Sequence, residues 1–283
     1  MPRRLVTSLN PADLAAAARR VARLESDPEL VPQIHHYCDR WCERCYARPR
    51  CLSYQLEQMR QSVQGWARRD PVHRSSWEQL TRVIAAKLQR LEDGITRSNH
   101  DLTSAVEERA DPWHTSSEAV TLLADARRYR QRARELLLRL PATLVASPKP
   151  PDLTYNAPWA DVRDALEVVD WFVFFIEAKL QRAAASRSEE AGQALAPQVS
   201  DAAGSAKIAL IAIDRSLAAW DTLRRNCAGE ADAILDLLAH LERLRAETER
   251  SFPHARQFHR PGFDDAGLSR NEDEGPAERR NRG

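Results

Sequence analysis

The sequence lacks the features that assign a chain to a membrane or a strongly charged surface. It has no uninterrupted apolar run of the ~18 residues that a membrane-spanning helix needs, and no apolar core follows the arginines near its start, as it would in a signal peptide. Its formal net charge is only +1, which gives no overall reason to expect nucleic acid or an acidic membrane as a partner. We therefore expect a cytoplasmic protein with no membrane contact.

Glycine and lysine are also scarce. There are 9 glycines in 283 residues, whereas charged residues make up 29% of the chain. The basic residues are 38 arginines and only 4 lysines, a ratio that indicates a GC-rich coding bias rather than selection for phosphate binding. With long periodic stretches of alanine, leucine, glutamate and arginine, this composition is typical of an all-helical protein.

Cysteine, in contrast, is concentrated in one place. Four of the five cysteines lie within fourteen residues, at Cys38, Cys42, Cys45 and Cys51. The spacing C-x3-C-x2-C-x5-C favours one metal ion or one iron–sulfur cluster in a reducing compartment, because a short loop can wrap soft thiolates around a single centre. Since zinc sites often use two C-x2-C pairs with a longer span between them, the compact run predicts a [4Fe-4S] cluster, with zinc as the alternative.

The same motif has a helical alternative. Positions 38, 42 and 45 fall on one face of a helix, where the three side chains would be buried structural thiols. On a continuous helix Cys38 and Cys45 would be about 10 Å apart along the axis, whereas two sulfurs on one zinc are at most about 4.6 Å apart. Ligation by all four cysteines therefore requires a break in the helix, and Pro49 supplies one.

Residues around the motif would add to such a centre. Four arginines would offset the negative charge of the thiolates, and a tryptophan would shield the centre from water. They are Arg40, Arg44, Arg48, Arg50 and Trp41. We expect His35 and His36 at the surface or in a capping role, with replacement of a cysteine ligand as the alternative. Cys227 has no cysteine neighbour and is expected to be a buried structural thiol.

Two short resemblances to known families involve these cysteines. Cys38-x3-Cys42-x2-Cys45 resembles the cluster motif of radical SAM enzymes, which implies a β/α barrel with an open iron site, but this chain offers no strands and Cys51 would fill the open site. Cys42-x2-Cys45-x5-Cys51 is similar to the iron–sulfur staple of RecB-family nucleases, and Gln33-x3-Tyr37 matches a short pattern of that family. The likeness covers fewer than twenty residues, and no catalytic residue is carried over from either family.

Apolar periodicity and capping signals predict helices in most of the remaining chain. The expected helices cover residues 10–25, 52–63, 75–108, 115–140, 158–184, 206–227 and 230–250. The third and fourth should pack as an antiparallel hairpin. We predict an all-α fold, a multi-helix bundle of about seven helices with an N-terminal four-cysteine metal or iron–sulfur loop.

Composition divides the chain into four regions. Residues 1–140 should form an N-terminal helical region that holds the cysteine motif and the hairpin, and the five prolines between 141 and 158 predict a linker. Residues 159–260 should supply C-terminal helices to the bundle, and residues 261–283 should be a disordered tail. Between two of those helices, residues 186–205 are predicted to be mobile.

Three acids are candidate catalytic residues. Asp170 lies within a run, Val168 to Ile176, that is apolar on every side but one and predicts a central helix of a bundle, where a buried carboxylate must be paired, hydrogen-bonded or protonated. Glu177 follows on nearly the same face, and Asp214 is on the next helix. The favoured interpretation is a structural ion-pair network, such as Asp170 with Lys207 or Arg215.

An arginine-rich stretch is a candidate partner surface. It comprises Arg127, Arg128, Arg130, Arg132 and Arg134. Such a helix can bind nucleic acid, although an ordinary solvated face is the favoured interpretation. The sequence thus predicts a metal-centre protein, structural or redox-sensing, that binds an unknown protein partner. The alternatives are a redox enzyme with a pocket lined by buried acids, and a zinc-stapled nucleic-acid-binding protein.

Overall fold

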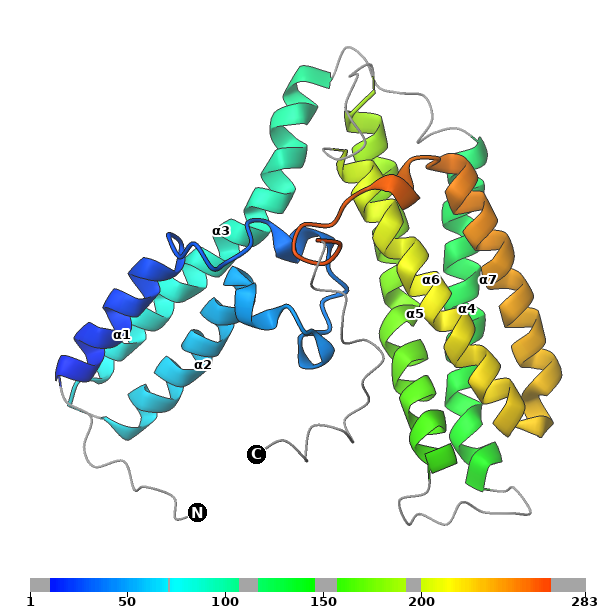
Figure 1. Ribbon diagram of the computed structural model, residues 1–283, viewed down its shortest axis with the longest axis horizontal. Coiled ribbons are helices and arrows are strands. Elements are labelled where there is room, and N and C mark those ends of the chain that lie inside the picture. Colours follow the sequence, from blue (N-terminus) through cyan, green and yellow to red (C-terminus); the bar gives the residue numbers. More distant parts are fainter. Residues whose placement is uncertain (1–10, 71, 107–116, 146–156, 192–199, 266–283) are drawn as a thin grey trace. The chain divides into compact units, whose positions relative to one another are not determined.

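The computed structural model describes residues 11–70, 72–106, 117–145, 157–191 and 200–265 (Figure 1). Within these ranges the chain forms seven α-helices and no strand, which confirms the all-α prediction. None of the described helices combines the length and apolar character required to cross a bilayer. The residues group into two compact units: unit 1, from residues 1–101 and 260–283, and unit 2, from residues 102–259.

Unit 1 is built on three helices that lie side by side in Figure 1. They are α1 (Pro11–Leu24), α2 (Leu52–Arg69) and α3 (Arg74–Val106). One face of each helix contributes to a common core, whose buried members are Ala17, Val21, Leu24, Leu56, Met59, Val63, Trp77, Leu80 and Ile84. Their spacing of three, four and seven residues is the stripe that a core-facing helix shows.

The junction between α2 and α3 is fixed by one carboxylate. Asp70 follows α2, and its Oδ2 accepts a hydrogen bond from the indole Nε1 of the fully buried Trp77 at 2.9 Å. Its Oδ1 accepts the backbone N–H of His73 at 3.2 Å. The hydrogen bond from Trp77 is the main influence that lowers the pKa of Asp70, and His73 lowers it further. The aspartate therefore closes the turn and orients the largest core side chain of unit 1.

Unit 2 is a bundle of four helices, α4 (Ser117–Val145), α5 (Ala157–Glu189), α6 (Asp201–Asn226) and α7 (Ala231–Ser251). Two short 3₁₀ helices, η6 (Ala228–Glu230) and η7 (Ala255–Gln257), follow α6 and α7. α5 and α6 form the most extensive pair, and α4 packs against α5 and α7. Small buried residues in the first half of α6, such as Gly204, Ser205 and Ala209, let the neighbouring backbone approach closely.

The core of unit 2 contains a buried polar pair. Trp220 and Tyr129 are both fully buried, and the indole Nε1 of Trp220 donates to the Tyr129 hydroxyl at 3.0 Å. Burial raises the pKa of Tyr129 to about 12. Because the tyrosine stays neutral, the pair joins α4 to α6 without burying a charge.

Several predicted boundaries differ from the structure. α4 continues through Pro141 to Val145, and residues 146–156 of the expected linker lie outside the described residues. Residues 186–205 were predicted to be mobile, and this is wrong at the two ends of the segment. Ser186, at its start, is buried and donates to Oδ2 of Asp201, near its end, at 2.6 Å. Residues 192–199 and the tail beyond residue 265 lie outside the described residues. The domain boundary placed at 141–158 stays a prediction.

The apolar run of α5 is not buried on all sides. Phe172 and Val173 are fully buried, whereas Trp171 and Phe174 are 38% and 45% exposed. Asp170 is exposed, so the prediction of a buried carboxylate at this position is wrong. The reason is that the run holds more aromatic residues than one helix face can bury, so the rest cover the outer surface.

Candidate functional site

The cysteine loop, residues 34–51, is a series of three single-turn 3₁₀ helices: η1 (Ile34–Tyr37), η2 (Cys42–Arg44) and η3 (Arg48–Arg50). Cys38, Cys45 and Cys51 each follow one of these turns in extended conformation, and Cys42 begins η2. Extended residues after a tight turn redirect the chain each time. The helical alternative, with three cysteines on one continuous face, is therefore wrong.

The chain reverses between Cys38 and Cys42. Arg40 has a φ of 60°, in the left-handed region that non-glycine residues seldom adopt. Just before it, the Asp39 carboxylate accepts the backbone N–H of Trp41 at 3.1 Å. This local hydrogen bond holds the turn, and Cys38 and Cys42 on either side of it in the sequence line the same pocket.

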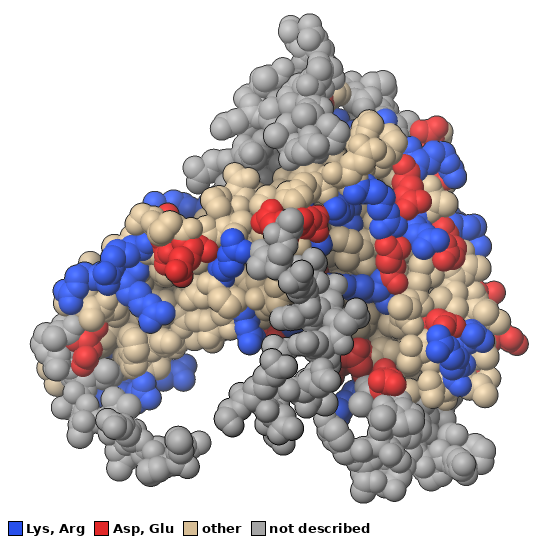
Figure 2. All heavy atoms as spheres, viewed as in Figure 1, with Lys and Arg blue, Asp and Glu red and all other residues tan. Residues whose placement is uncertain are grey.

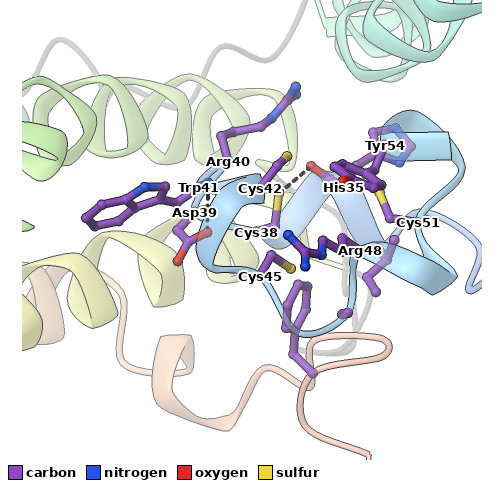
Figure 3. Close-up of a pocket in the computed structure, with 13 residues that line it drawn as sticks. His35, Cys38, Asp39, Arg40, Trp41, Cys42, Cys45, Arg48, Cys51 and Tyr54 are labelled. Carbon is purple, nitrogen blue, oxygen red and sulfur yellow. Dashed lines mark hydrogen bonds between the residues drawn. The ribbon is translucent and has the colours of Figure 1, made fainter. Parts of the chain in front are cut away.

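All four cysteines of the loop line this pocket (Figure 3). They are half-buried, and Figure 3 shows their side chains arranged around the space that the loop encloses. The other lining residues are Ile34, His35, Asp39, Arg40, Trp41, Ala47, Arg48, Tyr54 and Phe263. Except for Tyr54 on α2 and Phe263 near residue 265, the wall is made by the loop itself.

Phe263 belongs to a C-terminal segment, residues 260–265, that packs on the cysteine loop (Figure 1). The Tyr46 hydroxyl donates to the Phe263 carbonyl at 3.1 Å, and the two rings meet edge to face at 5.8 Å. Gly262 has a φ of 76°, and a Cβ at this position would lie 2.6 Å from Ile34 Cδ1. Glycine is thus required for the close approach, and residues 261–265 of the predicted disordered tail form part of the site.

The thiols influence one another electrostatically. Burial is the main cause that raises the pKa values of Cys42, Cys45 and Cys51, and the charges of neighbouring loop cysteines, including Cys38, raise them further. At neutral pH these groups are therefore protonated thiols. A bound cation would have the opposite effect, because a coordinating thiol is deprotonated.

His35 is not at the surface as expected. It is 5% exposed, and its carbonyl oxygen accepts the Cys38 thiol at 3.4 Å. Burial is the main cause that lowers the pKa of its imidazole to about 4, with the nearby charges of His36 and Arg40 adding to the effect. The ring is therefore neutral at physiological pH. Its ring meets that of His36 edge to face at 4.5 Å.

The flanking residues play different parts. Arg40 and Arg48 line the pocket, and their role in offsetting the charge of a centre stays a prediction. The Arg44 guanidinium instead stacks on the Trp41 ring at 4.1 Å. Trp41 lines the pocket, although in Figure 3 its ring projects away from the sulfurs, and shielding of a centre by the indole stays a prediction. Phe263 also lines the pocket, and no local sequence signal identifies it.

The four sulfurs share a pocket but do not form a ligand cluster. Within the described ranges, no group of three or more histidine, cysteine, aspartate or glutamate side chains is arranged to hold a metal ion. The metal loop predicted from the spacing is therefore not supported as a preformed site. Cys227 is 6% exposed and distant in sequence from the others, as predicted for a buried thiol.

The three candidate acids have separate environments. Glu177 is buried, and its carboxylate meets Arg130 Nε at 3.0 Å and Arg127 Nε at 3.4 Å. Asp214 is half-buried and pairs with Arg256 at 2.6 Å. The ion-pair interpretation fits these two residues, whereas the exposed Asp170 needs no buried partner.

The arginine-rich stretch of α4 is engaged by the bundle. Arg127 and Arg130 pair with Glu177, as above, Arg128 meets Asp125 at 2.6 Å and Arg132 meets Asp236 at 3.1 Å. The Arg134 guanidinium lies 4.9 Å from the centre of the Phe174 ring. On the described part of the face shown in Figure 2, basic and acidic side chains are intermixed. These contacts are those of a solvated, ion-paired face.

Sequence reasoning did not find Tyr54 and Phe263, and it gave His35 a minor role. Tyr54 could have been identified, because it lies one helical turn after Cys51 at the start of α2. Phe263 could not, because it is 217 residues from its partner Tyr46.

No protein family model, no curated protein and no solved structure matches this chain.

Proposed function

We propose that the cysteine loop binds a metal centre through its cysteines, and that this centre has a structural or redox-sensing role. The observation that supports the proposal is the placement of four half-buried cysteines, from three separate turns, on the wall of one pocket. Structural thiols need no such arrangement, because an apolar core satisfies them fully. Thiols that face a shared space are instead suited to ligation.

Ligation requires the loop to tighten. Two sulfurs on one zinc lie within about 4.6 Å of each other, and the described side chains are not yet arranged in this way. The turns that carry the cysteines are closed by few backbone hydrogen bonds, such as Cys45 N–H to the Cys42 carbonyl at 3.3 Å and Cys51 N–H to the Arg48 carbonyl at 3.3 Å. Small changes in backbone angles can move the sulfurs without unfolding α2, and metal binding commonly drives such ordering.

The proposed centre is a [4Fe-4S] cluster, with zinc as the alternative. The compact spacing supports a cluster, and Arg40 and Arg48 on the pocket wall would offset its negative charge. A four-thiolate set also suits zinc. The two centres differ in colour and redox activity, because zinc has no redox chemistry.

A protein partner is the second part of the proposal. Trp171 and Phe174 are exposed on α5, and Arg130 and Arg134 lie against the Phe174 ring at 5.5 and 4.9 Å from its centre. Exposed tryptophan, phenylalanine and arginine side chains are the types that dominate protein interfaces. The ion-paired arginines give no comparable support to nucleic-acid binding, and the exposed Asp170 gives none to a pocket of buried acids.

The test of the metal centre is elemental analysis of protein purified without oxygen. We expect a brown protein with broad visible absorption that is bleached by air, and about four irons per chain. The double variant Cys42→Ser/Cys45→Ser should lose the metal, whereas the control Cys227→Ser, in unit 2, should keep it. About one equivalent of zinc in a colourless protein would establish the alternative centre. Metal-free protein with four reduced loop thiols would reject both.

A further inference from the structure

His35 lies on the wall of the cysteine pocket and is the most deeply buried polar side chain there. It lies in η1, the turn that precedes Cys38, and it lines the pocket together with all four loop cysteines. Figure 3 shows its ring on the side of the pocket where Cys51 and Tyr54 lie. Only 5% of the residue is exposed and its Nε2 atom is buried, so bulk water cannot readily satisfy that nitrogen.

One ring nitrogen of His35 has no partner. The Nε2 atom is buried and makes no hydrogen bond to the described residues. A neutral imidazole carries its proton on one ring nitrogen and a lone pair on the other. With the proton on Nδ1, Nε2 has a lone pair to offer a ligand in the pocket that the residue lines.

A neutral imidazole with a free ring nitrogen is the form that binds a metal ion. A buried polar atom without a partner is uncommon and needs an explanation. The loop thiols are potential donors on the same wall, yet none of them satisfies Nε2. A group placed between the ring and the sulfurs would satisfy both.

We propose that Nε2 of His35 is a ligand of the metal centre, which then has one imidazole and three thiolates. This inference rests on the proposed function, because it assigns a ligand to the same centre. For zinc the set is Cys3His, a common structural site. For an iron–sulfur cluster, an imidazole ligand raises the reduction potential relative to an all-thiolate site. In both cases one of the four loop cysteines is not a ligand.

The experiment compares substitutions at two adjacent histidines. His35→Leu removes the lone pair but keeps an apolar side chain of similar size, and His36→Leu is the matched control. Each protein is stripped of metal, then titrated with zinc, or with iron and sulfide without oxygen, against a competing chelator. We expect His35→Leu to weaken metal binding by more than ~100-fold, since even indirect partners of a metal contribute about 10–100-fold. His36→Leu should bind like the wild type.

A second series identifies the cysteine that is not a ligand. With an imidazole in the set, one of the four variants Cys38→Ser, Cys42→Ser, Cys45→Ser and Cys51→Ser should retain the metal and the other three should lose it. In an all-thiolate centre all four should lose it. His35→Cys, which restores a ligand, should bind metal, and in an iron–sulfur centre its reduction potential should be lower than that of the wild type.

The outcomes separate this inference from the proposed function. If the wild type binds metal and His35→Leu binds it equally well, His35 is not a ligand, and the centre is made by the cysteines alone. A wild type that binds neither metal rejects the centre and His35 with it. Circular dichroism checks that His35→Leu folds. Should it not fold, His35→Cys is compared with His35→Ser, and equal metal binding by these two overturns the assignment.

Discussion

Polar side chains are treated differently in the bundle of unit 2 and in the loop of unit 1. In the bundle, Glu177 meets two arginines, and the indole N–H of Trp220 meets Tyr129. Buried atoms without a hydrogen-bond partner occur in both units, for example His240 Nδ1 in the bundle and His35 Nε2 in the loop. The loop differs because the residue with the orphan nitrogen lines one pocket together with four thiols. In the proposed function, this shared space is where the metal centre binds.

Two tryptophans allow the stability of the units to be measured separately. Trp77 in unit 1 and Trp220 in unit 2 are both fully buried, and each indole donates one hydrogen bond, at 2.9 Å to Asp70 and 3.0 Å to Tyr129. Trp77→Ala and Trp220→Ala should each cost about 3–5 kcal/mol, because they leave a large cavity. Amide hydrogen exchange should show the loss of protection confined to the unit that carries the substitution.

The phenylalanine variants at the same positions are the controls. Each keeps most of the ring volume and removes only the N–H donor, so the loss should be smaller than for alanine. If Trp220→Ala reduces protection from hydrogen exchange in α1 and α2 as much as in α5 and α6, the two units unfold as one cooperative body. Their stabilities could then not be measured separately.

The next effect in size concerns an ion pair of the bundle. Arg182 binds Asp201 through two hydrogen bonds, at 2.9 Å from Nε and 2.7 Å from Nη2. Burial raises the pKa of Asp201, but the hydrogen bonds and charge of Arg182, with Ser186, outweigh it and lower the pKa below its ordinary value. Asp201→Asn should cost about 1–3 kcal/mol at neutral pH, since the arginine loses a charged partner.

The pH dependence of this pair has a definite sign. A carboxylate whose pKa is lowered by folding stabilises the protein above the unfolded pKa, about 3.9. That stability disappears as the pH falls through the lower folded pKa. The difference between wild type and Asp201→Asn in urea unfolding should therefore be constant near neutrality and vanish in acid. Asp161→Asn, on the exposed face of α5, is the control and should show little difference at any pH.

A glycine substitution tests the contact between the cysteine loop and the C-terminal segment. Gly262→Ala introduces a Cβ at a φ of 76° and 2.6 Å from Ile34 Cδ1, so it should destabilise the segment by roughly 1–2 kcal/mol from the backbone conformation alone. Hydrogen exchange of residues 34–51 should become faster. Gly229→Ala is a matched control in unit 2, because a Cβ there meets nothing within 4 Å. Unchanged exchange in Gly262→Ala would show that the segment does not hold the loop.

The smallest effect is expected at Asp170. The side chain is exposed, and Asp170→Ala should change the free energy of unfolding by less than about 0.5 kcal/mol. Glu177 lies further along the same helix, and Glu177→Ala removes a buried carboxylate that pairs with Arg127 and Arg130. This substitution should lower the free energy of unfolding by about 1–3 kcal/mol. Equal effects of the two variants would mean that burial does not distinguish these acids.

The helices were predictable because their signals are local. Ser75 and Glu78 mark the start of a helix in sequence, and the apolar stripe through Trp77, Leu80 and Ile84 gives its core-facing side. The exposure of the Asp170 side chain was not predictable from its apolar neighbours. How much of a helix is buried depends on which other helices pack around it, and periodicity within α5 could not show that Trp171 and Phe174 face outward.

The cysteine loop was predictable only in its composition. The spacing identifies the residues that line the pocket, and Pro49 indicates that no continuous helix passes through them. The left-handed conformation of Arg40, the orphan nitrogen of His35 and the packing of Phe263 are consequences of tertiary contacts. Such contacts leave no periodic trace in a single sequence.

The C-terminal segment has a consequence for synthesis of the protein on the ribosome. Tyr46 and its partner Phe263 are 217 residues apart. At about 5–20 residues per second, translation of that distance takes roughly 10–40 s. During this interval the nascent cysteine loop is made, but Phe263, which lines its pocket, is not. Metal delivered early would reach an open loop, and metal delivered after release would have to pass a side chain that already lines the pocket.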